Sequence, residues 1–172
     1  MSLAKKLGLL GFVCVAVASC DDSGQIASRA NSDGFQAKYV ASRTALETGK
    51  YDKALKGYAR LLEESGPHEP RIRLEYAHVL LRSNAFAKAA NQAKVLASQE
   101  DGAARAAALS VQGTAEHEMA LAALRNGASG PEPKALLKSA LAALSEVVKK
   151  HPDMDPVGSL AKRMAAIEAQ LK

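Results

Sequence analysis

The pairing of histidine with glutamate at residues 117–118 comes nearest to a metal or acid–base site in this 172-residue chain. A zinc-protease helix contains the sequence His-Glu-x-x-His, which places two imidazoles one turn apart on one face. Here His117 and Glu118 are followed by Met119, Ala120 and Leu121, so the second imidazole ligand is missing. We therefore expect His117 to be a solvated helical residue beside glutamates, and we expect no metal site.

Other arrangements that support catalysis are also missing from the sequence. His68 and His151 lie next to prolines, and we interpret both as turn residues that interact with carbonyl groups at helix ends. No serine lies in a Gly-x-Ser-x-Gly elbow, and no glycine-rich phosphate loop follows a predicted strand. The sequence therefore indicates a non-catalytic protein that needs no cofactor.

The two cysteines lie at the start of the chain, where they have a different meaning. Lys5 and Lys6 precede an apolar run over residues 7–18 that includes Cys14. Twelve residues are too few to span a bilayer as a helix, which takes about 20. A basic segment followed by a short apolar run and small residues is typical of a secretory signal peptide, predicted here over residues 1–19.

The segment Val17-Ala18-Ser19-Cys20 resembles a bacterial lipobox, in which the cysteine receives a lipid on its sulfur and becomes the mature N-terminus. Without the lipid, Cys20 would be an odd exposed thiol in an oxidising compartment. The resemblance implies a lipid-anchored envelope protein that faces the periplasm, and Asp21 after the cysteine favours the inner membrane. Cleavage after Ala18 by the ordinary signal peptidase is the alternative, which would release a periplasmic protein beginning at Ser19.

The composition of the remaining chain favours helices. The whole sequence contains 35 alanines against 3 Phe, 4 Tyr and no Trp. Alanine is the best helix former. A β-sandwich or barrel needs β-branched and aromatic strands that this composition does not supply. We therefore predict an all-α protein with thin helix–helix interfaces. The leucines predicted to be buried are Leu55, Leu61, Leu80, Leu96 and Leu144.

Residues 20–34 are predicted to be a flexible tether, because they are small and polar with Ile26 as the only large aliphatic residue. The folded domain is predicted over residues 35–172. Within it, five pairs of similar residues recur 35 positions apart, a period typical of helical repeat arrays. The pairs are Ser42 and Ala77, Gly49 and Asn84, Tyr51 and Phe86, Ala54 and Ala89, and Leu61 and Leu96.

These residues resemble the tetratricopeptide repeat, a motif of two antiparallel helices. The best match runs from Ser42 in the first helix through Gly49 at the turn to Tyr51, Ala54 and Tyr58 in the second helix. Gly49 suits the left-handed backbone conformation that ends a helix. The resemblance covers residues 35–152, and it implies a solenoid of about three helical hairpins.

A weaker second unit follows over residues 70–100, and the third unit is interrupted. Its small residues, Gly113 and Ala140, are 27 positions apart, against 12 for Ser42 and Ala54, so the unit has 15 extra residues. A solenoid also needs a final helix to cover its last exposed face. The predicted elements of this part are a helix over residues 103–125, a surface loop over 126–133, a helix over 134–151 and an amphipathic capping helix over 155–172.

The resemblance further implies a concave groove lined by the first helix of each unit. An extended or helical peptide would bind there, with arginines gripping its carboxylates. The groove positions of the first two units are Tyr39, Arg43, Leu46, Glu47, Arg71, Leu74, His78, Leu81 and Arg82. Those of the third unit are Ser110, Thr114, His117 and Glu118.

We therefore expect an envelope lipoprotein that binds a protein or peptide as an adaptor. Similar lipoproteins assist pilus or secretion-system assembly, which is the leading process by analogy. The alternatives are a regulator or scaffold of a cell-wall enzyme and a small subunit of a stable envelope complex. Loss of residues 1–19 leaves 21 basic and 18 acidic residues, and this net charge of +3 is too mild to indicate nucleic-acid binding.

Overall fold

The computed structural model describes the backbone from Asp22 onward and the side chains from Gly34 onward. Over these residues the chain is all-helical and contains no strand. The predicted signal peptide and Cys20 lie outside the described residues. The α-helices are α1 Asp22–Glu47, α2 Tyr51–Glu63, α3 Glu69–Arg82, α4 Phe86–Gln99, α5 Gly102–Arg125, α6 Pro131–Lys150 and α7 Ser159–Leu171, with single 3-10 turns at η1 Gly66–His68 and η2 Pro152–Met154.

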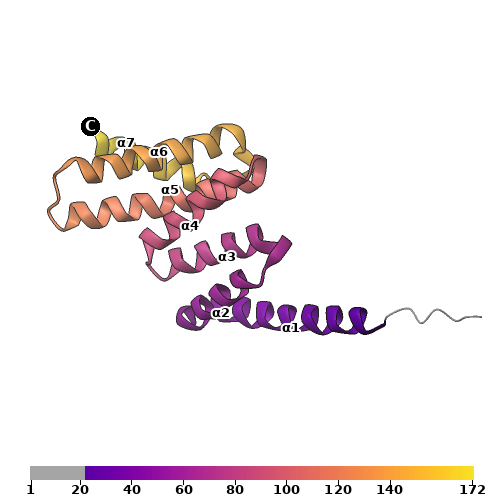
Figure 1. Cartoon of the computed structure of the whole chain (residues 1–172). Helices are drawn as coiled ribbons and strands as arrows, with labels where there is room; N and C mark the ends of the chain where they lie inside the picture. Colours follow the sequence, from indigo (N-terminus) through magenta and orange to yellow (C-terminus); the bar gives the residue numbers. More distant parts are fainter. Residues whose placement is uncertain (1–21) are drawn as a thin grey trace, which may run out of the picture.

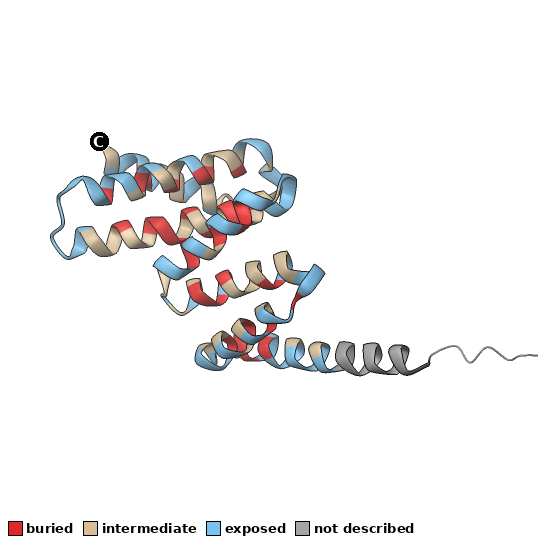
Figure 2. Ribbon diagram, in the orientation of Figure 1, coloured by how far each residue is buried: buried red, intermediate tan, exposed pale blue. Residues whose placement is uncertain are grey.

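Successive helices fold back on one another and stack from α1 to α7 (Figure 1). Each helix packs mainly on the next one in the chain, and α3 also contacts α5. Buried residues lie along the sides of the helices that face their neighbours (Figure 2). The all-α prediction is confirmed, and the helices predicted over residues 103–125 and 134–151 correspond to α5 and α6. No described helix has the length and hydropathy needed to cross a bilayer.

Three hairpin turns end their first helix in the same way. In the α1–α2 turn the N–H of Lys50 donates to the carbonyl of Ala45 over 2.8 Å, while the N–H of Gly49 donates to the next carbonyl over 3.1 Å. The same two bonds close the turns at Asn84 and Gly127. Gly49, Asn84 and Gly127 have φ values of 72°, 61° and 82°. This Schellman geometry needs a residue that tolerates the left-handed region, which explains the match of Gly49 with Asn84.

The matched small and aliphatic residues form the core between the helices. Ala54 and Ala89 are both 0 % exposed, so neighbouring helices approach closely at these points. Leu55 differs from the prediction and is only half-buried, because it packs against the edge of the first two core clusters rather than inside them. The other leucines predicted to be buried are in the core, namely Leu61, Leu80, Leu96 and Leu144.

Helix α1 begins earlier than the predicted domain boundary at residue 35. The backbone is helical from Asp22, so most of the segment predicted to be a flexible tether forms the first turns of α1. The segment contains no proline. A helix that is already anchored extends at little cost per residue, because only its first turn has to be nucleated.

The extra residues of the third unit lengthen its helices. Helix α5 has 24 residues and α6 has 20, whereas α2, α3 and α4 have 13 or 14. The two long helices cross closely at Gly113. A Cβ atom at Gly113 would lie 2.7 Å from Cγ of Leu144 and 3.0 Å from the carbonyl oxygen of Ala140. The small residue predicted for this position is therefore required by the packing.

The two ends of the stack differ. At the C-terminal end α7 packs on α6, and it begins at Ser159, later than predicted. The carboxylate of Asp155 sets this start, since it accepts the N–H groups of Leu160 and Ala161 at 3.0 Å each. At the other end, the described residues that line a groove come from α1 and α2 alone. Val40 beside this groove is 53 % exposed.

We expect Gly113→Ala to lower the free energy of unfolding by about 1 kcal/mol. Overpacking against Leu144 and the Ala140 carbonyl costs about 1–3 kcal/mol, and the better helix propensity of alanine returns about 1 kcal/mol. Urea unfolding followed by circular dichroism measures the change. Gly34→Ala in α1 is the matched control, because a Cβ atom there meets nothing within 4 Å and should not destabilise the protein. Equal effects of the two substitutions would contradict the proposed close packing.

Candidate functional site

A carboxylate on α3 joins the first three helices. Glu75 accepts a hydrogen bond from the Tyr39 hydroxyl of α1 at 2.8 Å and another from the Tyr58 hydroxyl of α2 at 2.6 Å. The Glu75 side chain is 14 % exposed and Tyr58 is fully buried. Burial and the hydrogen bond to Glu75 raise the pKa of Tyr58 above its ordinary value, so its hydroxyl stays protonated.

Two arginines complete this arrangement, which we call the Glu75 cluster (Tyr39, Arg43, Tyr58, Arg71 and Glu75). Arg71 donates to the Tyr39 hydroxyl at 2.8 Å and to Glu75 at 3.3 Å, and its guanidinium lies 5.2 Å from the centre of the Tyr39 ring. Arg43 lies 3.7 Å from Glu75 and donates to Glu47 at 2.7 Å. The Arg71 side chain is 68 % exposed, so the cluster presents an oriented cation to solvent.

A small pocket lies beside Arg71. Its volume is about 150 Å³, and its walls include the rings of Phe35, Tyr39 and His68 together with Ile72. The rings of Phe35 and His68 are 5.8 Å apart. The arrangement therefore combines an apolar recess with a guanidinium at its rim, which suits an apolar side chain next to a carboxylate.

The structure separates the predicted groove residues into two groups. Tyr39, Arg43 and Arg71 come together in the Glu75 cluster, and His78 and Arg82 lie exposed further along α3. The leucines do not form a groove floor, because Leu46 is buried and both Leu74 and Leu81 pack half-buried against core clusters. The sequence analysis missed Glu75 as the centre of this cluster, because charged residues are rare inside proteins. The one signal in the sequence was the spacing of Glu75 four residues after Arg71, which suits an ion pair on one face of a helix.

His78 reaches solvent, yet the protein around it affects its titration. Desolvation is the largest cause that lowers the pKa of His78, with Arg82 acting in the same direction and Glu75 against it. Neutral imidazole is therefore favoured near pH 7. A ligand bound at this part of α3 meets a neutral hydrogen-bonding ring at His78 and a cation at Arg82.

The predicted solvated state of His117 is wrong, because α7 covers it. His117 is 4 % exposed, with Nε2 lying 3.1 Å from Oε1 of Gln170 and Nδ1 lying 3.0 Å from Nη1 of Arg163. Arg163 also donates to Glu118 at 2.8 Å. Since an arginine N–H can only donate, Nδ1 accepts and the proton sits on Nε2 of a neutral ring. The groove predicted at His117 and Glu118 is thus filled by the chain's own α7.

A buried acid lies next to this histidine in the sequence and was also missed. Glu116 is fully buried on α5, and its carboxylate lies 2.6 Å from Nζ of Lys94 on α4. It also accepts a weak hydrogen bond from the side-chain amide of Gln112 at 3.4 Å. The Lys94 side chain is half exposed, so it shields the acid from solvent at the helix boundary. This ion pair fixes α4 against α5.

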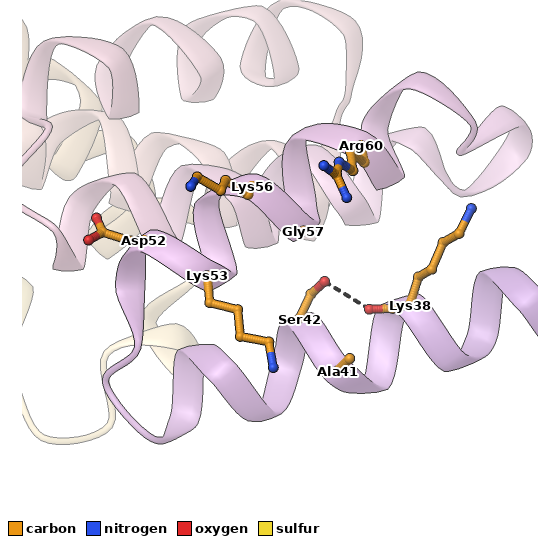
Figure 3. A pocket seen from close by; sticks show the side chains of 8 residues that line it. All are labelled: Lys38, Ala41, Ser42, Asp52, Lys53, Lys56, Gly57 and Arg60. Atoms are coloured by element: carbon orange, nitrogen blue, oxygen red, sulfur yellow. Dashed lines mark hydrogen bonds between the residues drawn. The ribbon is translucent and has the colours of Figure 1, made fainter.

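A larger pocket lies at the other end of the stack, between α1 and α2. It has a volume of about 570 Å³, and four cationic side chains surround it with a single acid, Asp52 (Figure 3). Lys53 reaches from α2 toward α1 across the opening (Figure 3). We call this site the basic groove; its lining residues are Lys38, Ala41, Ser42, Asp52, Lys53, Lys56, Gly57 and Arg60.

No known family, curated protein or solved structure matches this chain. Within the described part of the chain, no group of three or more His, Cys, Asp or Glu side chains is placed to hold a metal ion. Cationic side chains lie beside apolar recesses at two places, the Glu75 cluster and the basic groove, and those of the Glu75 cluster are held in place by hydrogen bonds. Such surfaces recognise acidic groups on peptides or proteins.

We expect Tyr58→Phe to lower the free energy of unfolding by about 1–3 kcal/mol near pH 7, because Glu75 loses a charge-assisted hydrogen bond. In the native protein the raised pKa of Tyr58 gives stability that is lost as pH rises above about 10, where the unfolded tyrosine ionises. Unfolding curves at neutral and alkaline pH measure both effects. The variant should lose less stability than the native chain between these pH values, and a parallel loss would contradict the assignment.

We expect acidification to weaken the docking of α7. The pKa of His117 is lowered, chiefly by burial. The stability that its neutral ring gives the folded chain is therefore present above about pH 6.5 and is lost as pH falls below that value. Arg163 opposes the protonated ring directly, while Glu118 on the same helix favours it. Unfolding free energies measured between about pH 7.5 and pH 5 should fall less steeply for His117→Gln than for the native chain. Identical slopes would show that His117 does not titrate in this range.

Proposed function

We propose that this chain is a non-catalytic adaptor of the bacterial envelope that binds a protein or peptide on the side of α1 and α3. The observation that supports this function best is the exposed guanidinium of Arg71 at the rim of the 150 Å³ pocket. Glu75 and Tyr39 hold this guanidinium in place, so little side-chain freedom is lost when a ligand binds. Preorganised cations of this kind suit a fixed carboxylate partner.

The ligand that fits this site is a peptide segment with an acidic group next to an apolar side chain. A cavity of about 150 Å³ holds a group the size of a benzene ring. The carboxylate would pair with Arg71, and the apolar side chain would enter between Phe35 and Ile72. His78 and Arg82 extend the polar surface along α3, so a longer segment can continue in that direction.

The finer architecture belongs to the same proposal. Three hairpins similar to tetratricopeptide repeats, closed by α7, account for the repeated Schellman turns and for the matched buried alanines. Arrays of this type bind partners along a face made of successive first helices. In this chain α7 occupies that face at α5, so we place the ligand on the first two units.

The location in the envelope rests on the sequence. A signal peptide over residues 1–19 and a lipid on Cys20 would tether the adaptor to a membrane on its periplasmic side. A part in pilus or secretion-system assembly is the process we favour, by analogy with lipoproteins of similar build. Control of a cell-wall enzyme and membership of a stable envelope complex are the competing processes.

A photo-crosslinking residue at position 78 tests the proposed face in intact cells. We expect a discrete crosslinked protein at this position and none at position 138, an exposed site on α6. Arg71→Ala should reduce the crosslinked product about tenfold, as removal of a binding arginine commonly does, whereas Arg125→Ala at the end of α5 should not. A pilus or secretion component in the crosslinked product supports the favoured process. A cell-wall hydrolase in the product would instead support the control of a cell-wall enzyme.

Fractionation of the same cells tests the lipid anchor. The native chain should be found with the membranes, and the Cys20→Ser variant should be found with the soluble periplasmic proteins. If both forms are soluble, the lipid assignment fails. If position 78 yields no product above position 138 in either form, the binding face on α1 and α3 is wrong.

A further inference from the structure

The basic groove shares no residue with the Glu75 cluster, and it has its own charge pattern. Lys53, Lys56 and Arg60 line it from α2 and form no ion pair with any described residue. Lys38 lines it from α1 and pairs with Glu64 at 2.7 Å. Three uncompensated cations around one opening favour an anionic ligand.

The floor of the groove consists of small side chains. Gly57 of α2 lies so close to Ser42 of α1 that a Cβ atom would approach the Ser42 hydroxyl oxygen to 2.1 Å. That hydroxyl already donates to the carbonyl of Lys38 at 2.8 Å, so Ser42 offers no free donor to the groove (Figure 3). Ala41 completes a closed, mostly apolar floor that another helix can approach closely.

An exposed apolar strip continues the floor along α1. Ala37, Val40 and Ala41 line a shallow depression that shares Ala41 with the basic groove. Val40 is one of few large hydrophobic side chains described as exposed. At the far end of the stack the corresponding apolar surface of α6 is covered by α7. The strip and the groove together therefore form an end face on which one more helix fits.

We propose that this end face docks an amphipathic helix of a partner protein whose small apolar stripe is flanked by acidic residues. The stripe packs on Ala41 and Val40, and the acids pair with Lys53, Lys56 and Arg60. Charge complementarity selects the partner, because the groove supplies four cations against one acid. This surface is separate from the face of α1 and α3 proposed above, and the two can succeed or fail independently.

The chain's own segments do not provide such a helix. Residues 1–21 contain Lys5 and Lys6 against a single acid, Asp21. Helix α7 of a second copy would extend the stack, but it contains Lys162 and Arg163 against one acid, Glu168. Both segments have a net charge of +1 and therefore do not complement the cationic groove.

Binding of designed peptides to the purified full chain tests the proposal. One peptide is a helix with an alanine stripe flanked by glutamates, and its matched control has lysines in place of the glutamates. We expect the acidic peptide to bind in a salt-sensitive manner and the basic peptide not to bind. Lys53→Glu combined with Lys56→Glu should weaken binding at least about tenfold, and so should Val40→Glu, which leaves the cations in place.

A charge-matched double variant on α6, Lys134→Glu with Lys138→Glu, controls for net charge and should bind the acidic peptide like the native chain. Circular dichroism confirms that each variant is folded. Equal binding of the two peptides, or unchanged binding by the Lys53 and Lys56 variant, would overturn the proposal. Vesicles with and without phosphatidylglycerol test a membrane surface as the other anionic partner. If the native chain binds the anionic vesicles and no peptide, and the Lys53 and Lys56 variant does not bind the vesicles, the groove binds a membrane and the proposal of a partner helix is overturned.

Discussion

Close approach of helix backbones at small residues is the constraint on which the rest of this stack depends. Gly57 lies against Ser42, and Gly113 lies against Leu144, at distances that leave no room for a Cβ atom. A chain with 3 Phe and no Trp has little side-chain volume to fill wider gaps. The interfaces are therefore thin, and thin interfaces bring side chains of one hairpin within reach of the next. The Glu75 cluster exists because α1, α2 and α3 lie this close together.

Partly or fully buried acids and a buried histidine then orient the closely packed helices. Glu75 joins α3 to α1 and α2, Glu116 pairs with Lys94 across α4 and α5, and His117 meets Gln170 across α5 and α7. Every buried side-chain nitrogen and oxygen among the described residues has a hydrogen-bond partner. A sliding or rotated helix would leave a charge buried without its partner, which is strongly unfavourable. Alanine surfaces alone are nearly uniform and would specify the register of the helices less sharply.

The sequence predicted those features that depend on neighbours along the chain. The helices, the turns at Gly49 and Asn84 and the small residue at Gly113 follow from propensity and spacing. The partners of charged residues do not, because they depend on how two distant helices are oriented. Hence Arg71 was predicted at a groove position without its partner Glu75, which went unnoticed, and His117 was assigned to solvent although α7 covers it. Leu46, Leu74 and Leu81 were likewise assigned to a groove, although Leu46 is buried in the core and the other two pack half-buried against it.

Packing that is confined mainly to consecutive helices also determines how the molecule comes apart. Such an array folds and opens unit by unit, because no single contact set spans all of it. A pulling force applied through the N-terminal end of α1 loads the interface of the first hairpin and the hydrogen bonds of Glu75 before it reaches α5. The long α5–α6 pair, locked by Gly113 and capped by α7, then remains folded while the first hairpin separates. Under such a force we expect the chain to open first in its first hairpin and to keep its C-terminal half folded.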